Sequence, residues 1–214
     1  MDDLGRQSKH LDASALIACI HAVAYNDIRI TQNEELLRGL MEKARQDEID
    51  YGNLAYKELE REVRRNPQIE VVISSTALAE TSKRILEEEN ERLSSRMWKA
   101  LNRIYRDLRP RYVEVNEEVL EIAMEVASKD DYLRGRFSNC LIVAQAIYDP
   151  FSTHLFTLDK CVINSKVVRD LSASRKEVDL ARALTSSIWG CWGIFPYKGS
   201  LSKQVRVAVR APSH

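Results

Sequence analysis

Short β-branched runs alternate along the chain with longer stretches in which apolar residues recur at helical spacing. Residues 69–74 form the clearest predicted strand, because they are short, β-branched and followed by residues that cap a helix. Other short strands are predicted to end at Asp12 and to span 112–115 and 154–158. Helical patterns separate these strands, so the order of elements predicts an α/β fold with a mostly parallel sheet covered on both faces.

Residues 137–159, FSNCLIVAQAIYDPFSTHLFTLD, are the stretch around which the rest of the chain is organised. They predict an apolar helix capped by Ser138, which Pro150 prevents from continuing. The strand at 154–158 follows, and Asp159 stands where that strand ends. Functional residues of open α/β sheets gather at the carboxyl ends of parallel strands, which makes Asp159 the first candidate site residue.

The stretches between the strands predict long, charged helices. Thr31 and Glu34 have the spacing of a capping box and open a helical region that Gly52 is expected to divide into two helices. A second helical pattern runs from the end of the strand at 69–74 towards Leu108 and is expected to form one long helix.

The chain ends in an aromatic and basic segment. Between 204 and 211 the valines alternate with Arg206, Ala208 and Arg210, which predicts an edge strand with one basic face. Arg206 and Arg210 on this face are candidates for contacting a nucleic-acid backbone. An ordinary strand that packs on the sheet is the alternative interpretation.

Composition limits the class of protein without identifying it. A chain of 214 residues with 44% apolar content suits one α/β domain with elaborations, or one domain with a small appendage. The net charge is zero, but the last 35 residues carry +5 and the preceding residues −5. This asymmetry is a modest indication of a polyanionic partner.

The cysteines and the absence of long apolar runs indicate where the protein works. The chain has four cysteines, Cys19, Cys140, Cys161 and Cys191. They are widely spaced and include no CxxC pair, so reduced thiols in a cytoplasmic protein are expected. The sequence contains no signal-peptide pattern and no apolar run that could span a bilayer, so we expect a soluble protein with no membrane partner.

Three acidic residues occupy comparable positions after predicted strands. Asp12 and Asp159 end strands, and Glu80 lies on the helix that follows the strand at 69–74. Neighbouring strands would bring the three carboxylates to one edge of the sheet, where their mutual repulsion favours a bound cation. Hard oxygen ligands suit Mg²⁺ or Mn²⁺. An unrelated α/β domain with three coincidental acids remains an alternative.

Four short motifs in a fixed order carry a family resemblance. They are LDAS at 11–14, VISSTALAE at 72–80, FSNCLIVAQA at 137–146 and LFTLDK at 155–160. Together they resemble the PIN-domain family of metal-dependent nucleases, which includes toxin ribonucleases of microbial toxin–antitoxin pairs. The resemblance covers roughly residues 8–170. It implies a three-layer α/β/α sandwich that cleaves the phosphodiester bonds of single-stranded RNA.

The resemblance also implies which residues form the site. Asp12, Glu80 and Asp159 would hold Mg²⁺ or Mn²⁺. Ser14 and Thr157 would support them as polar neighbours. RNA is the implied substrate, and an antitoxin or other protein partner and a homodimer are further expectations.

The resemblance divides the chain into two parts. Relative to compact members of the family, residues 31–68 and 84–111 are enlarged by helical insertions. Residues 1–170 would therefore form a PIN-like nuclease domain, and residues 171–214 a C-terminal extension packed on or beside it.

One position departs from the family pattern. Asn139 stands where the family usually has an aspartate, and an amide oxygen brings no charge to a cation. The chain is therefore expected to be an impaired endoribonuclease, with a catalytically inactive RNA- or protein-binding module as the alternative. Asn139 is either natural or an engineered inactivating change. Asp130, Asp131 and Asp149 are the nearby acids that could substitute for the missing charge.

Overall fold

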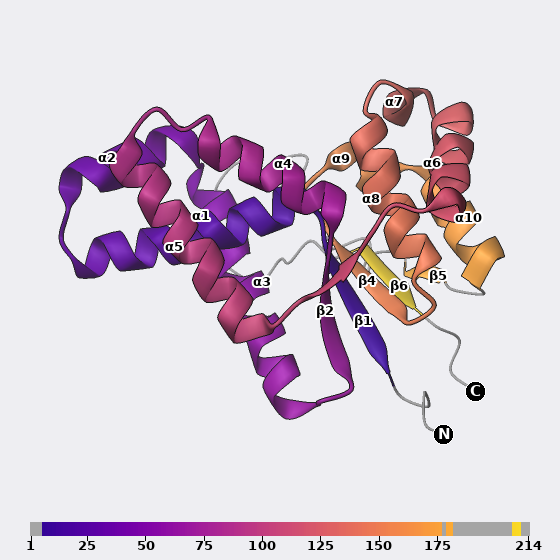
Figure 1. The fold of residues 1–214 in the computed structure, drawn as a ribbon, viewed down its shortest axis with the longest axis horizontal. Coiled ribbons are helices and arrows are strands. Elements are labelled where there is room, and N and C mark those ends of the chain that lie inside the picture. Colours follow the sequence, from indigo (N-terminus) through magenta and orange to yellow (C-terminus); the bar gives the residue numbers. More distant parts are fainter. Residues whose placement is uncertain (1–5, 177–178, 182–206, 211–214) are drawn as a thin grey trace.

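The computed structural model describes residues 6–176, 179–181 and 207–210 of the chain (Figure 1). Its sheet has the strand order β3-β2-β1-β4-β6-β5. The first four strands are parallel to one another, and β6 and β5 continue the sheet in antiparallel pairings. The strands are β1 (Gln7–Leu11), β2 (Ile69–Ser74), β3 (Arg111–Val113), β4 (Ser152–Phe156), β5 (Asp179–Ala181) and β6 (Val207–Arg210).

The parallel part of the sheet confirms the α/β class expected from the sequence. In the centre, Leu11 of β1 is paired with Ile73 of β2 and with Phe156 of β4. The carboxyl ends of these three strands therefore lie at the same edge of the sheet. β4 ends at Phe156, slightly before the predicted end at Leu158, and Asp159 follows in a short loop.

Helices lie on both sides of this sheet. Figure 1 shows α1, α2, α3 and α5 on one side and α6, α8 and α10 on the other, an arrangement compatible with the expected three-layer sandwich. The helices are α1 (Ala13–Ile30), α2 (Glu34–Lys43), α3 (Gln46–Arg65), α4 (Ser75–Leu86), α5 (Glu91–Leu108), α6 (Glu117–Lys129), α7 (Asp131–Arg134), α8 (Phe137–Tyr148), α9 (Lys160–Asn164) and α10 (Lys166–Lys176). Helix α10 runs across the predicted domain boundary at residue 170. No described helix combines the length and apolarity that crossing a membrane requires.

The prediction that Gly52 divides two helices was wrong. Gly52 lies inside α3, and the division between α2 and α3 falls at Ala44 and Arg45. Gly52 is buried where α3 crosses α1, and a Cβ atom built on it would lie 1.9 Å from the carbonyl oxygen of Ala18. The residue is a glycine because two helix backbones meet there, not because the helix ends.

Three predicted helix boundaries were also misplaced. Asn33, rather than Thr31, is the N-cap of α2, and its side-chain oxygen accepts a hydrogen bond from the backbone N–H of Leu36 at 3.0 Å. The expected long helix is split into α4 and α5, because Asn90 caps a new start. Helix α8 follows Arg136 without a side-chain cap, so Ser138 does not cap it.

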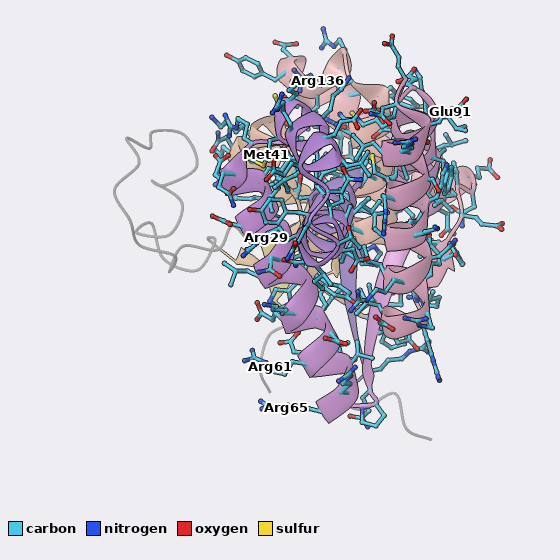
Figure 2. All side chains as sticks on the ribbon, turned by 90° about the vertical axis from the view of Figure 1, so that its left-hand side faces the viewer. Arg29, Met41, Arg61, Arg65, Glu91 and Arg136 are labelled. Atoms are coloured by element: carbon cyan, nitrogen blue, oxygen red, sulfur yellow. The ribbon has the colours of Figure 1, made fainter. Side chains whose placement is uncertain are left out.

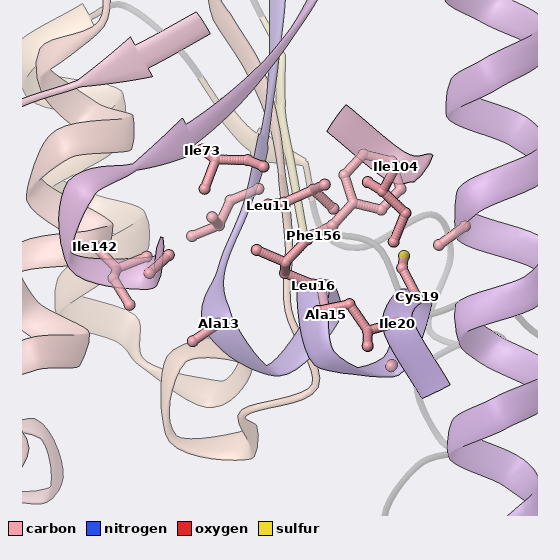
Figure 3. Packing of buried hydrophobic residues seen from close by; sticks show 14 of the residues in the cluster. Leu11, Ala13, Ala15, Leu16, Cys19, Ile20, Ile73, Ile104, Ile142 and Phe156 are labelled. Atoms are coloured by element: carbon pink, nitrogen blue, oxygen red, sulfur yellow. The ribbon is translucent and has the colours of Figure 1, made fainter. Parts of the chain in front are cut away.

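The core lies on both sides of β1 and beneath the start of α1. Figure 3 shows Leu11, Ile73 and Phe156 among the side chains that pack around this point. Ile104 of α5 and Ile142 of α8 belong to the same cluster of buried residues, although they come from helices on opposite sides of the sheet. The strand ends that carry the candidate site therefore rest on well-packed residues, which fixes the backbone from which the polar side chains project.

The prediction of an edge strand near the C-terminus was wrong in its position. β6 lies between β4 and β5, so it is not at the edge of the described sheet. Within it, Arg210 is paired through its backbone with Asp179. Arg206 and the aromatic segment at 187–197 lie outside the described residues.

Candidate functional site

Asp12 is held at the turn from β1 into α1. It is the N-cap of α1, and its Oδ1 accepts hydrogen bonds from the backbone N–H of Ala15 at 2.8 Å and from the Ser14 hydroxyl at 2.7 Å. An aspartate at this position satisfies backbone donors that the first turn of a helix leaves without partners. The cap therefore fixes the carboxylate at the carboxyl end of β1.

Asp159 is fixed in the same way after the neighbouring strand β4. It is the N-cap of α9, and its Oδ1 accepts a hydrogen bond from the backbone N–H of Cys161 at 2.7 Å. Its own N–H donates to the Thr157 hydroxyl at 2.9 Å. Two parallel neighbouring strands are thus each followed by an aspartate that caps a helix.

Ser14 and Thr157 connect the two loops. The Ser14 hydroxyl donates to Asp12 and accepts a hydrogen bond from the backbone N–H of Leu158 at 2.8 Å. It also lies 3.5 Å from the Thr157 hydroxyl. The structure therefore brings Asp12, Ser14, Thr157 and Asp159 together, and both residues expected to be polar supports lie between the two aspartates.

Burial makes Asp12 a weaker acid than an exposed aspartate. Its side chain is only 6% exposed, and loss of hydration raises its pKa from 3.8 to about 6. Hydrogen bonds from Thr157, Ala15 and Ser14 oppose this rise in pKa, whereas the nearby charge of Asp159 adds to it. Near neutral pH the Asp12 carboxylate is therefore largely ionised, and no positively charged side chain in the described part of the chain forms an ion pair with it.

Asn139 faces Asp159 from the first turn of α8. Its Nδ2 donates a hydrogen bond to Oδ2 of Asp159 at 2.5 Å. Nη1 of Arg136 lies 3.4 Å from the same oxygen. Asn139 therefore lies beside one of the expected carboxylates, and its amide presents a donor to Asp159 where an aspartate would present a second negative charge.

Glu80 stands apart from these contacts. It lies half-buried on α4, beside the inward-facing stripe that includes Ala77 and Thr81, and it forms no hydrogen bond or ion pair within the described part of the chain. Among the described residues, no three histidine, cysteine, aspartate or glutamate side chains are grouped closely enough to hold a metal ion. The structure therefore joins two of the three expected acids and leaves Glu80 as a prediction.

The other acids near Asn139 in the sequence are engaged elsewhere. Asp130 caps α7 and accepts a hydrogen bond from the Ser165 hydroxyl at its other oxygen. Asp149 lies before the start of β4 and contacts His10 at 2.9 Å and Arg111 at 2.7 Å. Burial opposes its ionisation, but these partners hold the pKa of Asp149 well below its usual range. Neither acid replaces the missing charge at Asn139.

Arg136 is a further residue at the candidate site, and the sequence did not point to it. It lies in the polar segment before α8, where no hydrophobic pattern or motif distinguishes it from its neighbours. Its contact with Asp159 depends on the path that the chain takes from α7 into α8, and this path is visible only in the folded structure.

Comparisons of the chain with protein-family models, with curated proteins and with solved structures found no match.

Proposed function

We propose that this protein is a PIN-like endoribonuclease that requires a divalent cation, hydrolyses single-stranded RNA and is impaired by Asn139. The observation that supports the proposal most is the pair of aspartates, Asp12 and Asp159, at the carboxyl ends of two neighbouring parallel strands. This edge is where α/β proteins place their reactive groups. The helix caps keep both carboxylates in fixed positions.

The donor atoms suit a hard cation. Asp12 and Asp159 supply carboxylate oxygens, and Asn139 can turn its amide oxygen towards the same space. These oxygens are the ligand type that Mg²⁺ and Mn²⁺ prefer. A cation would also compensate the charge of the buried Asp12, whose raised pKa reflects the cost of ionising it without one. Glu80 is the further ligand expected from the family pattern.

The protein's own residues would prepare the site for hydrolysis. When bound, the cation supplies Lewis-acid activation of water and neutralisation of charge on the phosphate. Ser14 and Ala15 hold the Asp12 carboxylate in one orientation through hydrogen bonds to its Oδ1. Thr157 fixes the backbone before Asp159 in the same manner. Such fixed ligands reduce the reorganisation that the reaction requires.

Asn139→Asp is expected to raise the affinity for Mn²⁺ by about tenfold, since it replaces a donor amide with a third ligand charge. Cleavage of single-stranded RNA in the presence of Mn²⁺ should appear or increase in the same variant. The assay compares the parent chain and Asn139→Asp on one RNA, with and without EDTA. Asn66→Asp is the matched control, because Asn66 lies before β2, at the opposite edge of the sheet.

The alternative is a catalytically inactive PIN-like module that binds RNA or a protein. The hydrogen bond from Asn139 to Asp159 favours this alternative, because it occupies an oxygen that a cation would need. Retention of RNA without cleavage in either chain would support the inactive module. If neither chain binds Mn²⁺, the acids are coincidental and the nuclease proposal is wrong.

A further inference from the structure

Arg136 makes a weak, exposed contact with Asp159 that a ligand of Asp159 could replace. Its backbone is tied to the start of α8, because its carbonyl accepts hydrogen bonds from the N–H groups of Asn139 at 2.9 Å and Cys140 at 3.3 Å. Its side chain is 57% exposed and reaches Oδ2 of Asp159 with a single nitrogen at 3.4 Å. An exposed contact of this length is weak, so a stronger ligand can replace it.

The contact of Arg136 competes with a cation. Oδ2 of Asp159 already accepts a hydrogen bond from Asn139, and the Arg136 guanidinium approaches the same oxygen. A divalent ion at this oxygen would have to displace the guanidinium, whose positive charge repels it. Within residues 6–176, 179–181 and 207–210, no other positively charged side chain forms an ion pair with Asp12, Glu80 or Asp159.

Once displaced from Asp159, the guanidinium of Arg136 would be free to pair with a phosphate of the RNA backbone. Asp12 and Asp159 make the surroundings of the site negative, which disfavours the approach of an RNA backbone. A guanidinium has five N–H donors in a planar fork that matches a phosphate group. Figure 2 shows Arg136 at one end of the molecule, whereas Arg61 and Arg65 lie at the other end and do not reach this site.

We propose that Arg136 exchanges partners, pairing with Asp159 before the cation binds and with a phosphate of single-stranded RNA afterwards. This inference rests on the proposed function. It assigns to Arg136 the role of a phosphate-contacting residue that also weakens cation binding.

Two measurements on Arg136→Ala, each made in the Asn139→Asp background, test this exchange. Mn²⁺ affinity, measured by calorimetry without RNA, should rise roughly two- to fivefold, the range expected for removing an exposed ion pair. Binding of a hydrolysis-resistant phosphorothioate RNA with saturating Mn²⁺ should weaken instead. The plot of log affinity against log salt concentration should become shallower by about 0.7, as expected for the loss of one phosphate contact on a single strand.

Two control variants separate the exchange from general effects of charge. Arg134 is 60% exposed and paired with Asp131, outside the site, so Arg134→Ala should leave the Mn²⁺ affinity unchanged. Arg65→Ala removes the same charge at the far end of the molecule and should leave the salt dependence unchanged. Arg136→Lys keeps the charge and should keep most of the salt dependence. Thermal unfolding of each variant checks that the fold is intact.

The outcomes distinguish this inference from the proposed function. If the Asn139→Asp chain binds Mn²⁺ and the oligonucleotide but Arg136→Ala changes neither affinity, the role of Arg136 is wrong and the proposed function stands. Opposite changes in the two affinities support the exchange. If the Asn139→Asp chain binds neither ligand, both proposals fail together.

Discussion

Gly52→Ala is expected to lower the free energy of unfolding by about 3 kcal/mol, although alanine is the better helix former. The new Cβ atom would lie 1.9 Å from the carbonyl oxygen of Ala18, which is part of the α1 backbone and cannot rotate away. Helices α1 and α3 would have to move apart and open the core that supports Asp12. The loss should therefore exceed the gain in helix propensity.

Gly39→Ala is the matched control for this substitution. Gly39 also lies inside a helix, α2, but the nearest side-chain atoms are 4.0 Å from a Cβ atom built on it. The same change there should stabilise the protein by about 0.5–1 kcal/mol through helix propensity. Urea unfolding of the two variants beside the parent chain measures both effects. Equal stabilisation by both substitutions would show that α1 and α3 do not pack as described.

Asp12→Asn is expected to stabilise the protein at alkaline pH and to have little effect in acid. The pKa of Asp12 is raised from 3.8 to about 6 in the folded state, mainly by burial. The folded protein therefore holds this proton more tightly than the unfolded chain does. The contribution of Asp12 to the free energy of unfolding falls as the pH rises from about 4 to about 6. Above that range the ionised carboxylate costs about 3 kcal/mol, which an uncharged amide avoids.

Asparagine preserves the other role of this residue. It is as good an N-cap as aspartate, so the hydrogen bond from Ala15 can remain. Unfolding free energies measured from about pH 4 to about pH 8 should show the two chains diverging as the pH rises. Asp131→Asn, at a side chain that is 86% exposed, should follow the parent chain throughout. Parallel curves for Asp12→Asn and the parent chain would contradict the burial of an ionisable Asp12.

The sheet was predictable because its determinants are local. The strand at 69–74 occurs where expected, those near 7–11, 111–113 and 152–156 occur within a few residues of their predicted positions, and their alternation with helices favours parallel strands. The helix boundaries were less predictable. Gly52 looks like a helix end in the sequence, and only the crossing of α1 and α3 explains it. The capping-box spacing of Thr31 obscured the N-cap of α2 at Asn33. An unbroken helical pattern obscured the N-cap of α5 at Asn90.

The candidate site was predictable to the extent that its residues end strands. Asp12 and Asp159 converge because β1 and β4 are neighbours, a condition that the sequence left open and the sheet pairing supplies. Glu80 projects from a helix, where a shift of one residue in the helix start turns a side chain by about 100°. Its direction therefore could not be derived from its sequence position. The contact of Arg136 with Asp159 depends on loop geometry, for which the sequence carries no periodic signal.

The binding of one divalent cation by Asp12 and Asp159 can be tested by counting the protons that Mn²⁺ releases. Burial raises the pKa of Asp12 to about 6, so Mn²⁺ binding to the Asn139→Asp chain near that pH should release a fraction of a proton from it, and the number of protons released should fall as the pH is raised. Calorimetric titrations in buffers with different ionisation enthalpies give this number. Asp12→Asn in the same background should abolish both binding and proton release. Mn²⁺ binding that is unchanged in Asp12→Asn, or no binding in either chain, would contradict a cation site at these two strand ends.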